Sequence, residues 1–301
     1  MIDVGPLYPL MYEAIVRRAL EEDLGLAGDV TSDAVVPEDS CVRARLVARR
    51  QGRVAGLPVA LSAFRLLCTQ LAIVVDHNDG ADVLSGTTIA AVEGPARPIL
   101  TAERTALNLL CRLCGIATAT RAAAEVVAGT RTRIVCTRKT TPGLRALEKY
   151  AVRVGGGVNH RFGLDDGVLI KDNHIVAAGG IERAVRRARK RLGHMVKIEV
   201  EVDTFDQLRE LIAVGADAVL FDNMTAEQLR EAVALVDGRM VTEASGGITL
   251  ANLGEVAAAG VDIVSLGWLT HSAPILDIGL DVEPLATSVG TVGGRLAAVV
   301  L

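Results

Sequence analysis

The second half of the chain carries a repeat of apolar strand and helix patterns whose length hardly varies, and this repeat limits the folds that the sequence can adopt. Polar residues close successive strand segments at Glu201, Asp222, Glu243 and Ser265, which lie 21, 21 and 22 residues apart. An interval of this length holds one strand and one helix, the βα unit of parallel sheets. The sequence therefore predicts an α/β fold, either a βα barrel or an open parallel sheet. Six strand segments are expected, at about residues 134–137, 167–170, 196–202, 217–222, 240–244 and 261–266.

The part of the chain before Gly129 has a different pattern, which predicts helices layered on a sheet of short strands. A long helix is expected from about Thr101, whose hydroxyl can cap it. The tail, residues 285–301, has a glycine-rich stretch and a final apolar run, so an added strand and a frayed end both stay open. Further helices are expected at residues 10–23 and 58–68, and strands at 41–47, 54–56, 71–76 and 88–92.

The bulk composition is that of a folded globular protein with an aliphatic core. The chain has 301 residues, enough for one large or two ordinary domains, with 50% apolar, 23% charged and only 3% aromatic residues. No apolar run reaches the length of a membrane span, and the start lacks the basic flank and apolar stretch of a secretion signal. We therefore expect a cytoplasmic protein with no membrane partner.

The five cysteines are an odd number for a protein of this size, which indicates reduced thiols. Cys111 and Cys114 form a CxxC pair within a helical pattern, with no second pair or nearby histidine to complete a metal site. We expect this pair to pack inside the protein. Metal binding or redox chemistry is the alternative.

Positive charge is concentrated between Arg131 and Lys171. This stretch holds nine Lys and Arg residues against three acidic ones, whereas the whole chain has a net charge of −4. Guanidinium groups bind carboxylate and phosphate as forks and lysines add point charge, so the stretch indicates a site for a small, highly charged anion. We do not expect nucleic acid as a ligand, because the chain is acidic overall and has few aromatic side chains to stack on bases.

Polar side chains lie where the apolar strand segments stop, and in a parallel sheet all of them meet at one edge. Glu201 and Asp222 follow neighbouring strands and together can hold Mg²⁺, which takes one or two protein carboxylates and completes its shell with substrate oxygens. The same two carboxylates can stabilise a cationic sugar. The structural alternative is that each forms an ion pair with a nearby Lys or Arg. The other residues at these ends are Arg138, Lys139, Lys171, Glu243, Ser245, Ser265 and Gly267.

Two glycine-containing loops after the last strands suit a phosphate. Ser245-Gly246-Gly247 precedes a helical segment, and Ser265-Leu266-Gly267 ends the next strand. Glycine lets backbone N–H groups approach an anion, and the last loops of βα barrels commonly bind phosphate. An ordinary turn is the alternative for either loop alone.

His160 and Arg161 follow the glycine run 155–157, which is able to bend around a ligand, and we expect both side chains to contact the anion. His174 stays open between ligand contact and orientation of its own loop.

These residues belong to an ordered series of motifs that resembles the quinolinate phosphoribosyltransferase family, the carboxylating nicotinate-nucleotide pyrophosphorylases, over residues 10 to about 283. Cys114 stands where the family often has serine. The matching motifs are EDLG and GDVTS (22–25 and 28–32), ERTALN (103–108), TRKT (137–140), GGGVNHR (155–161), LIKDNH (169–174), EVEV (199–202), DNM (222–224) and EASGG (243–247).

The resemblance implies a fold and an assembly. The fold is an N-terminal open-faced α/β sandwich, residues 1–115 with a return of the chain at 275–301, plus an incomplete barrel of six βα units, residues 116–274. The family works as a homodimer in which the partner's N-terminal domain covers each barrel mouth, and some members assemble further, for example as hexamers.

The implied reaction is the conversion of quinolinate and phosphoribosyl pyrophosphate to nicotinate mononucleotide, pyrophosphate and CO₂ with Mg²⁺, a step of NAD biosynthesis. By the same resemblance the catalytic residues are Lys139, Lys171, Glu201 and Asp222, with Mg²⁺ at the last two. Quinolinate contacts Arg138, His160, Arg161 and Lys171, with Arg104 reaching in from the other subunit. The 5′-phosphate contacts Ser245, Gly246, Gly247 and Gly267.

Two other functions stay open at this point. A barrel lyase or isomerase would use Lys139 or Lys171 as a Schiff-base amine. A noncatalytic relative would bind the diacid without releasing pyrophosphate, although the retained acidic pair argues against it.

Overall fold

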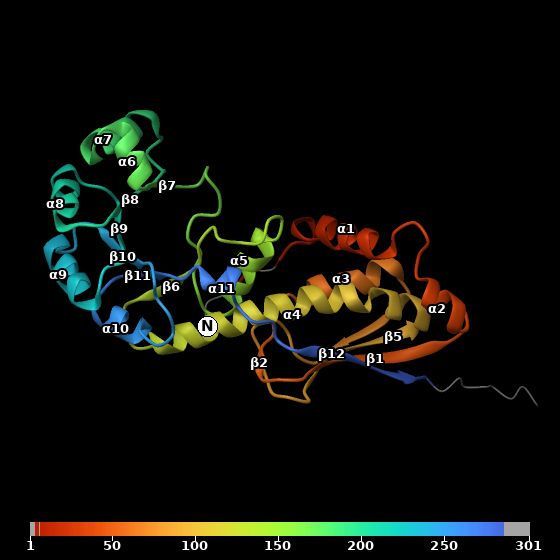
Figure 1. Cartoon of the computed structure of the whole chain (residues 1–301). Helices are drawn as coiled ribbons and strands as arrows, with labels where there is room; N and C mark the ends of the chain where they lie inside the picture. The colour runs from red at the N-terminus through yellow and green to blue at the C-terminus, as the bar shows by residue number, and fades with distance from the viewer. Residues whose placement is uncertain (1–3, 6, 286–301) are drawn as a thin grey trace, which may run out of the picture.

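A 31-residue helix, α4 (Ala96–Val126), connects the two halves of the molecule. The structure is a computed structural model that describes residues 4, 5 and 7–285 (Figure 1). The expected start of this helix at Thr101 is wrong, because the helix begins five residues earlier, after Pro95. The Thr101 hydroxyl lies within the helix, 2.9 Å from a carboxylate oxygen of Asp29, and ties α4 to the segment before α2 (Val30–Val35).

The N-terminal half is an antiparallel sheet of four strands in the order β12-β1-β5-β3. Their bounds are β1 (Cys41–Ala48), β3 (Ala72–Val75), β5 (Thr88–Pro95) and β12 (Ile278–Pro284). Because β12 pairs with β1, the chain returns to its first sheet after completing the second half. The expected strand at 54–56 is wrong, since these residues belong to no strand and the antiparallel pairing lies just before them, between β2 (Gly52–Arg53) and β4 (Asp82–Val83).

The helices of this half cover one face of the sheet, as Figure 1 shows. Besides α4 they are α1 (Glu13–Leu24), preceded by the 3-10 turn η1 (Pro9–Met11), and α3 (Leu57–Leu67). Along β1, Ala44 and Leu46 are fully buried, whereas Arg43 and Arg45 alternate with them. The guanidinium of Arg43 pairs with Glu93 of β5 at 3.1 Å. The sheet therefore has one apolar face and one charged face, which is the arrangement of an open-faced sandwich.

The second half is a six-stranded parallel sheet that curves into an incomplete barrel, which confirms the predicted fold class. The strand order is β6-β11-β10-β9-β8-β7, so the first strand pairs with the last and the open seam lies between β6 and β7. Val158 bridges to Val135 of β6 and partly fills the seam. The strands are β6 (Arg133–Val135), β7 (Val168–Ile170), β8 (Ile198–Val202), β9 (Ala218–Asp222), β10 (Val241–Ser245) and β11 (Ile263–Ser265).

Helices follow the barrel strands and lie outside them, as the arc of α6 to α10 in Figure 1 shows. The starts of α8 and α9 are set by sequence, because Thr204 and Thr225 each cap a helix in a reciprocal pair with a glutamine three residues later. The helices are α5 (Arg145–Val154), α6 (Asp172–Ala178), α7 (Ile181–Arg191), α8 (Phe205–Val214), α9 (Ala226–Val236), α10 (Leu253–Ala258) and α11 (Trp268–His271).

Strand β8 shows that the two faces of the barrel sheet differ: one packs under the helices, and the other faces the barrel axis. Ile198, Val200 and Val202 are buried in the apolar core beneath the helices. Glu199 and Glu201 alternate with them and therefore point to the opposite face, toward the barrel axis. The interior of this barrel thus carries charged groups along the same strand whose other face builds the core.

The glycine run after α5, expected to bend around a ligand, packs against α4. A Cβ added at Gly155 would lie 2.5 Å from Cβ of Thr120, and one at Gly157 would lie 2.9 Å from Cγ2 of the same threonine. Glycine is needed here because α4 passes too close for any side chain.

All five cysteines are free, which agrees with the prediction of reduced thiols. Cys111 and Cys114 are buried inside α4, and Sγ of Cys114 accepts the backbone N–H of Ala55 at 3.3 Å. The expected packing role of the CxxC pair is confirmed. Among the helices of the described residues, none has the length and hydropathy needed to cross a bilayer. The open question of the tail concerns residues 286–301, which lie outside the described residues.

Candidate active site

The carboxyl ends of the six barrel strands form one mouth, at which most of the expected site residues lie. Each loop that leaves a strand on this side contributes at least one of them, because parallel strands end at the same edge. The mouth residues are Arg138 and Lys139 after β6, Lys171 after β7, Glu201 in β8, Asp222 at the end of β9, Ser245, Gly246 and Gly247 at the end of β10, and Ser265 and Gly267 at the end of β11.

The guanidinium groups of Arg138 and Arg161 act on one another at this mouth. Burial and the charge of Arg138 lower the pKa of Arg161. Nε of Arg138 is buried and has no hydrogen-bond partner among the described residues. Two like charges with an unused donor are costly unless an anion joins them, so this pair is suited to a carboxylate.

Lys139 passes directly over the loop after β11. A Cβ added at Gly267 would lie 3.0 Å from Cδ of Lys139, so glycine makes room for the lysine stem. The hydroxyl of Thr270 donates to the carbonyl oxygen of Lys139 at 2.9 Å and fixes the loop that carries it. The lysine is exposed and its ammonium group is available at the mouth.

Lys171 and Glu201 form an ion pair between the ends of adjacent strands β7 and β8, with 2.5 Å between Nζ and Oε2. Nδ1 of His174 accepts the backbone N–H of Lys171 at 2.9 Å and caps α6. The His174 ring therefore orients the loop that carries Lys171.

Asp222 lies beside the glycine pair of β10. It pairs in register with Ser245 and accepts a hydrogen bond from Nδ2 of Asn223 at 2.7 Å. Gly246 has a φ of 89°, and a Cβ there would lie 2.3 Å from Oδ1 of Asn223. Glycine is therefore required for the backbone to turn at this point, immediately next to the acidic group.

Glu201 and Asp222 suit a hard divalent cation by their chemistry. They lie on neighbouring strands, and Glu201 pairs in register with Leu220, so Asp222 stands two residues closer to the mouth. Both offer only oxygen atoms, the ligands that Mg²⁺ prefers.

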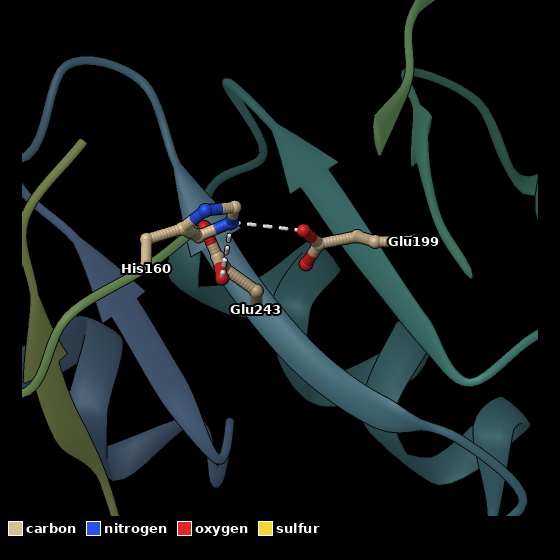
Figure 2. A group of neighbouring side chains, drawn as sticks. All are labelled: His160, Glu199 and Glu243. Carbon is tan, nitrogen blue, oxygen red and sulfur yellow. Dashed lines mark hydrogen bonds and ion pairs between the residues drawn. The ribbon is translucent and has the colours of Figure 1, made fainter. Parts of the chain in front are cut away.

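His160 lies deeper than expected, between two glutamates inside the barrel (Figure 2). Its Nε2 is 2.9 Å from Oε2 of Glu199 and 3.6 Å from Oε2 of Glu243. Burial lowers the pKa of His160, but the hydrogen bond to Glu199 and the two carboxylate charges outweigh it and raise the pKa. Burial, and next the charge of Glu199, raise the pKa of Glu243 to about 8.

No role was predicted for Glu199 or Glu243. The alternation Ile-Glu-Val-Glu-Val in β8 is the signal that could have identified Glu199, because a strand buried on one face must present both glutamates to the other. For Glu243 the alternation gives no signal, since Thr242 on the opposite face of β10 is also polar and buried. The 21-residue spacing from Asp222 predicts a strand-end position for Glu243, but its side chain is buried inside the barrel.

Arg104 does not reach the mouth of its own chain. Its side chain is exposed on α4 and lines a cleft with residues of α1 and of the turn that follows it. Within the positive stretch from Arg131 to Lys171, some side chains lie away from the mouth. Arg131 pairs with Asp262 at 3.2 Å, and Lys149 is fully buried. The positive stretch therefore contributes only part of its charge to the mouth.

A barrel mouth with convergent cations beside two carboxylates defines an enzyme that handles a small polyanion, and comparison with known proteins gives the family. The chain matches the family models for the N-terminal domain of quinolinate phosphoribosyl transferase over residues 29–114 and for its C-terminal domain over residues 116–281. The chain belongs to the quinolinate phosphoribosyltransferase family.

Individual relatives support the same family. The probable carboxylating nicotinate-nucleotide pyrophosphorylase of Bacillus subtilis is 48% identical, over 91% of this chain and 94% of the relative. The corresponding protein of Mycobacterium leprae is 46% identical, over 88% and 95%. The solved structure of the Francisella tularensis nicotinate-nucleotide pyrophosphorylase is 36% identical and superposes with a TM-score of 0.89, covering 94% of this chain and all of that one.

Proposed function

We propose that the barrel mouth is where this quinolinate phosphoribosyltransferase joins its two substrates. The reaction transfers the phosphoribosyl group of phosphoribosyl pyrophosphate to the ring nitrogen of quinolinate and removes one carboxylate. The products are nicotinate mononucleotide, pyrophosphate and CO₂, and the step belongs to NAD biosynthesis.

Two observations carry the assignment of the quinolinate site: burial and the charge of Arg138 lower the pKa of Arg161, and Nε of Arg138 is buried without a partner among the described residues. The mutual repulsion of the two guanidiniums is relieved by a ligand that brings two carboxylates, and quinolinate is a pyridine with two adjacent ones. Lys171 would contact a carboxylate of the acceptor from the other side of the seam, and Lys139 would meet the phosphates of the donor.

Glu201 and Asp222 would face the ribose. Departure of pyrophosphate leaves positive charge on the sugar, and two fixed carboxylates stabilise that charge without reorganising. When bound there, Mg²⁺ would neutralise the pyrophosphate leaving group. Ser245, Gly246, Gly247, Ser265 and Gly267 would receive the 5′-phosphate through backbone N–H and hydroxyl groups.

The loss of CO₂ follows from the transfer. Once the ring nitrogen is bonded to the sugar it carries a positive charge, which stabilises an electron pair left on the adjacent C2 carbon. The C2–carboxylate bond then breaks, CO₂ leaves, and C2 takes up a proton. The main requirement of the reaction is therefore that the protein binds and orients the charged groups.

We also propose a homodimer in which Arg104 of one subunit completes the mouth of the other, and a cytoplasmic location. The exposed position of Arg104, outside its own mouth, and the five free thiols support these two proposals.

The test is a product assay with quinolinate, phosphoribosyl pyrophosphate and Mg²⁺, in which nicotinate mononucleotide and CO₂ are followed together. We expect the two products in equal amounts, and far less nucleotide from nicotinate, which lacks the second carboxylate. Nucleotide formation from nicotinate at the same rate would contradict the proposed acceptor site. Trapping of a borohydride-reduced adduct on a lysine would favour the Schiff-base alternative.

A further inference from the structure

Three side chains meet inside the barrel, below the mouth residues, and the proposed function assigns a role to none of them. Glu199 comes from β8 and Glu243 from β10, and His160 comes from the segment that fills the open seam between β6 and β7. Figure 2 shows the imidazole between the two carboxylates. The side chain of Glu243 is 2% exposed and those of His160 and Glu199 are 16% and 13% exposed, so water screens this cluster weakly.

The hydrogen bonds fix the proton of the imidazole. The backbone N–H of Arg161 donates to Nδ1 of His160 at 2.8 Å, so Nδ1 acts as an acceptor. Nε2 therefore carries the proton and donates it to Glu199 at 2.9 Å. The two glutamate charges favour a second ring proton, but the contact from Arg161 leaves no place for it, and in this geometry the ring is neutral.

Hydrogen bonds also fix the backbone of the segment that carries His160 and Arg161. The ammonium group of Lys149, buried in α5, donates to the carbonyl oxygen of His160 at 2.9 Å. Nη1 of Arg161 donates to the carbonyl oxygen of Gly167 at 3.1 Å. The segment that presents the Arg161 guanidinium is thus tied to α5 through its backbone and to β8 through the His160 ring.

A neutral ring leaves two buried carboxylates facing each other across it. Two such groups cannot both ionise at low cost, because their repulsion is large where water is excluded. Oε1 of Glu243 has no hydrogen-bond partner among the described residues. The groups that face Glu243 are Glu199 from β8 and His160 from the seam, together with the Ser265 hydroxyl from β11, which favours the ionised form.

We propose that Glu199 and Glu243 are positioning residues for quinolinate binding: Glu199 anchors His160 and through it Arg161, and Glu243 remains protonated at neutral pH so that only one negative charge lies beneath the anion site. The inference rests on the proposed function, since it assigns Arg161 to the quinolinate site. Loss of the proton from Glu243 would add a charge that repels the dianionic acceptor and competes with Glu199.

The test compares the pH dependence of the quinolinate KM in the wild type and in Glu243→Gln, at saturating Mg²⁺ and donor. For the wild type we expect a rise of about tenfold between about pH 7 and about pH 9, since the protonated fraction of a group whose pKa is about 8 falls tenfold over that range. Glutamine has the shape of the protonated acid and cannot ionise. Its KM is therefore expected to stay within about threefold of the neutral wild-type value throughout.

Two further variants separate positioning from packing. Glu199→Gln removes the anionic acceptor of the His160 proton, and we expect the quinolinate KM to rise at every pH while the donor KM stays unchanged. Asp217→Asn removes a carboxylate at the amino end of β9, where Asp217 accepts the Ile198 N–H at 2.9 Å, and is expected to leave the quinolinate KM and its pH dependence unaltered.

Several outcomes would overturn the inference while leaving the function intact. One is an active Glu243→Gln variant that keeps the wild-type rise in KM, and another is a folded variant that loses activity at neutral pH, which would mean that Glu243 acts as an anion. Manganese bound at the three side chains in a crystal of the wild type would make the cluster a metal site. If the glutamine variant does not fold, a ¹³C NMR titration of glutamate-labelled wild type decides, because one buried carboxyl should titrate near pH 8. A wild type that makes no nicotinate mononucleotide would instead refute the function itself.

Discussion

The ammonium group of Lys171 and the carboxylate of Glu201 lie 2.5 Å apart, although one follows β7 and the other belongs to β8. The lysine side chain is 46% exposed and the glutamate 11%, so the pair stands at the boundary between the mouth and the barrel interior. An acceptor carboxylate that binds Lys171 would weaken this ion pair, and the freed carboxylate would then be available to the ribose. The pair would thereby couple binding of the acceptor to the environment of the sugar.

We expect Lys171→Ala to lower kcat/KM for quinolinate by about a hundredfold or more, because an anion contact and the partner of Glu201 are lost together. Glu201→Ala should cause a loss of similar size. If the two side chains act as a unit, the double variant should lose far less than the product of the two single losses. Steady-state kinetics of the four proteins measure this, and fully additive losses would show that the two groups work independently.

Mg²⁺ should be required for turnover, and Asp222 should set its apparent affinity. Chelation is expected to abolish product formation reversibly, and Asp222→Asn to raise the Mg²⁺ concentration for half-maximal rate by about tenfold or more, since an amide oxygen is a weaker ligand than a carboxylate. Asp206→Asn, at an exposed side chain of α8 paired with Arg209, is the matched control. An unchanged Mg²⁺ dependence in Asp222→Asn would place the ion elsewhere.

The buried thiol of Cys114 should behave as a packing group. Burial raises the pKa of this thiol, and alkylation should therefore modify exposed Cys41 and leave Cys114 intact until the protein unfolds. Cys114→Ser should change the unfolding free energy by less than about 1 kcal/mol, because a hydroxyl can also accept the Ala55 N–H, whereas Cys114→Leu should cost about 1 to 3 kcal/mol by overpacking. Mass spectrometry and denaturant titrations measure both effects, and rapid alkylation of Cys114 in the native state would contradict them.

The strand ends could be predicted because they depend on local pattern and one geometric rule. Two spacings of 21 residues locate Glu201, Asp222 and Glu243 on successive strands, and parallel strands bring their ends together whatever the details of packing. The same reasoning could not show that the glycines at 155 and 157 make room for Thr120, since that contact joins α4 to a segment more than 30 residues away. The helix start at Ala96 was missed for a similar reason, because Thr101 resembles a cap but its hydroxyl contacts Asp29.

The buried position of His160 could not be predicted from the sequence, because His160 lies in the irregular segment at the open seam of the barrel. A strand assigns its side chains to alternate faces, but His160 lies in an irregular segment whose direction is set by Lys149 and Glu199, residues on different elements. The sequence therefore predicts an anion contact for His160 and no role for the glutamates that hold it.

Arg104 gives the sharpest test of the proposed dimer. Its side chain lines a cleft on α1 and α4 and none of the mouth residues lines that cleft, so it can serve quinolinate only in another subunit. We expect Arg104→Ala and Lys139→Ala each to be nearly inactive alone. In a two-fold dimer that shares its sites, a mixed dimer of the two variants has one intact mouth and one that lacks both groups. An equal mixture contains half mixed dimers, so co-expression with two different tags should restore about a quarter of the wild-type activity. Purification through both tags isolates the mixed dimer, whose activity should reach about half of the wild-type value. A mixed dimer no more active than its parents would mean that Arg104 does not complete the partner's site.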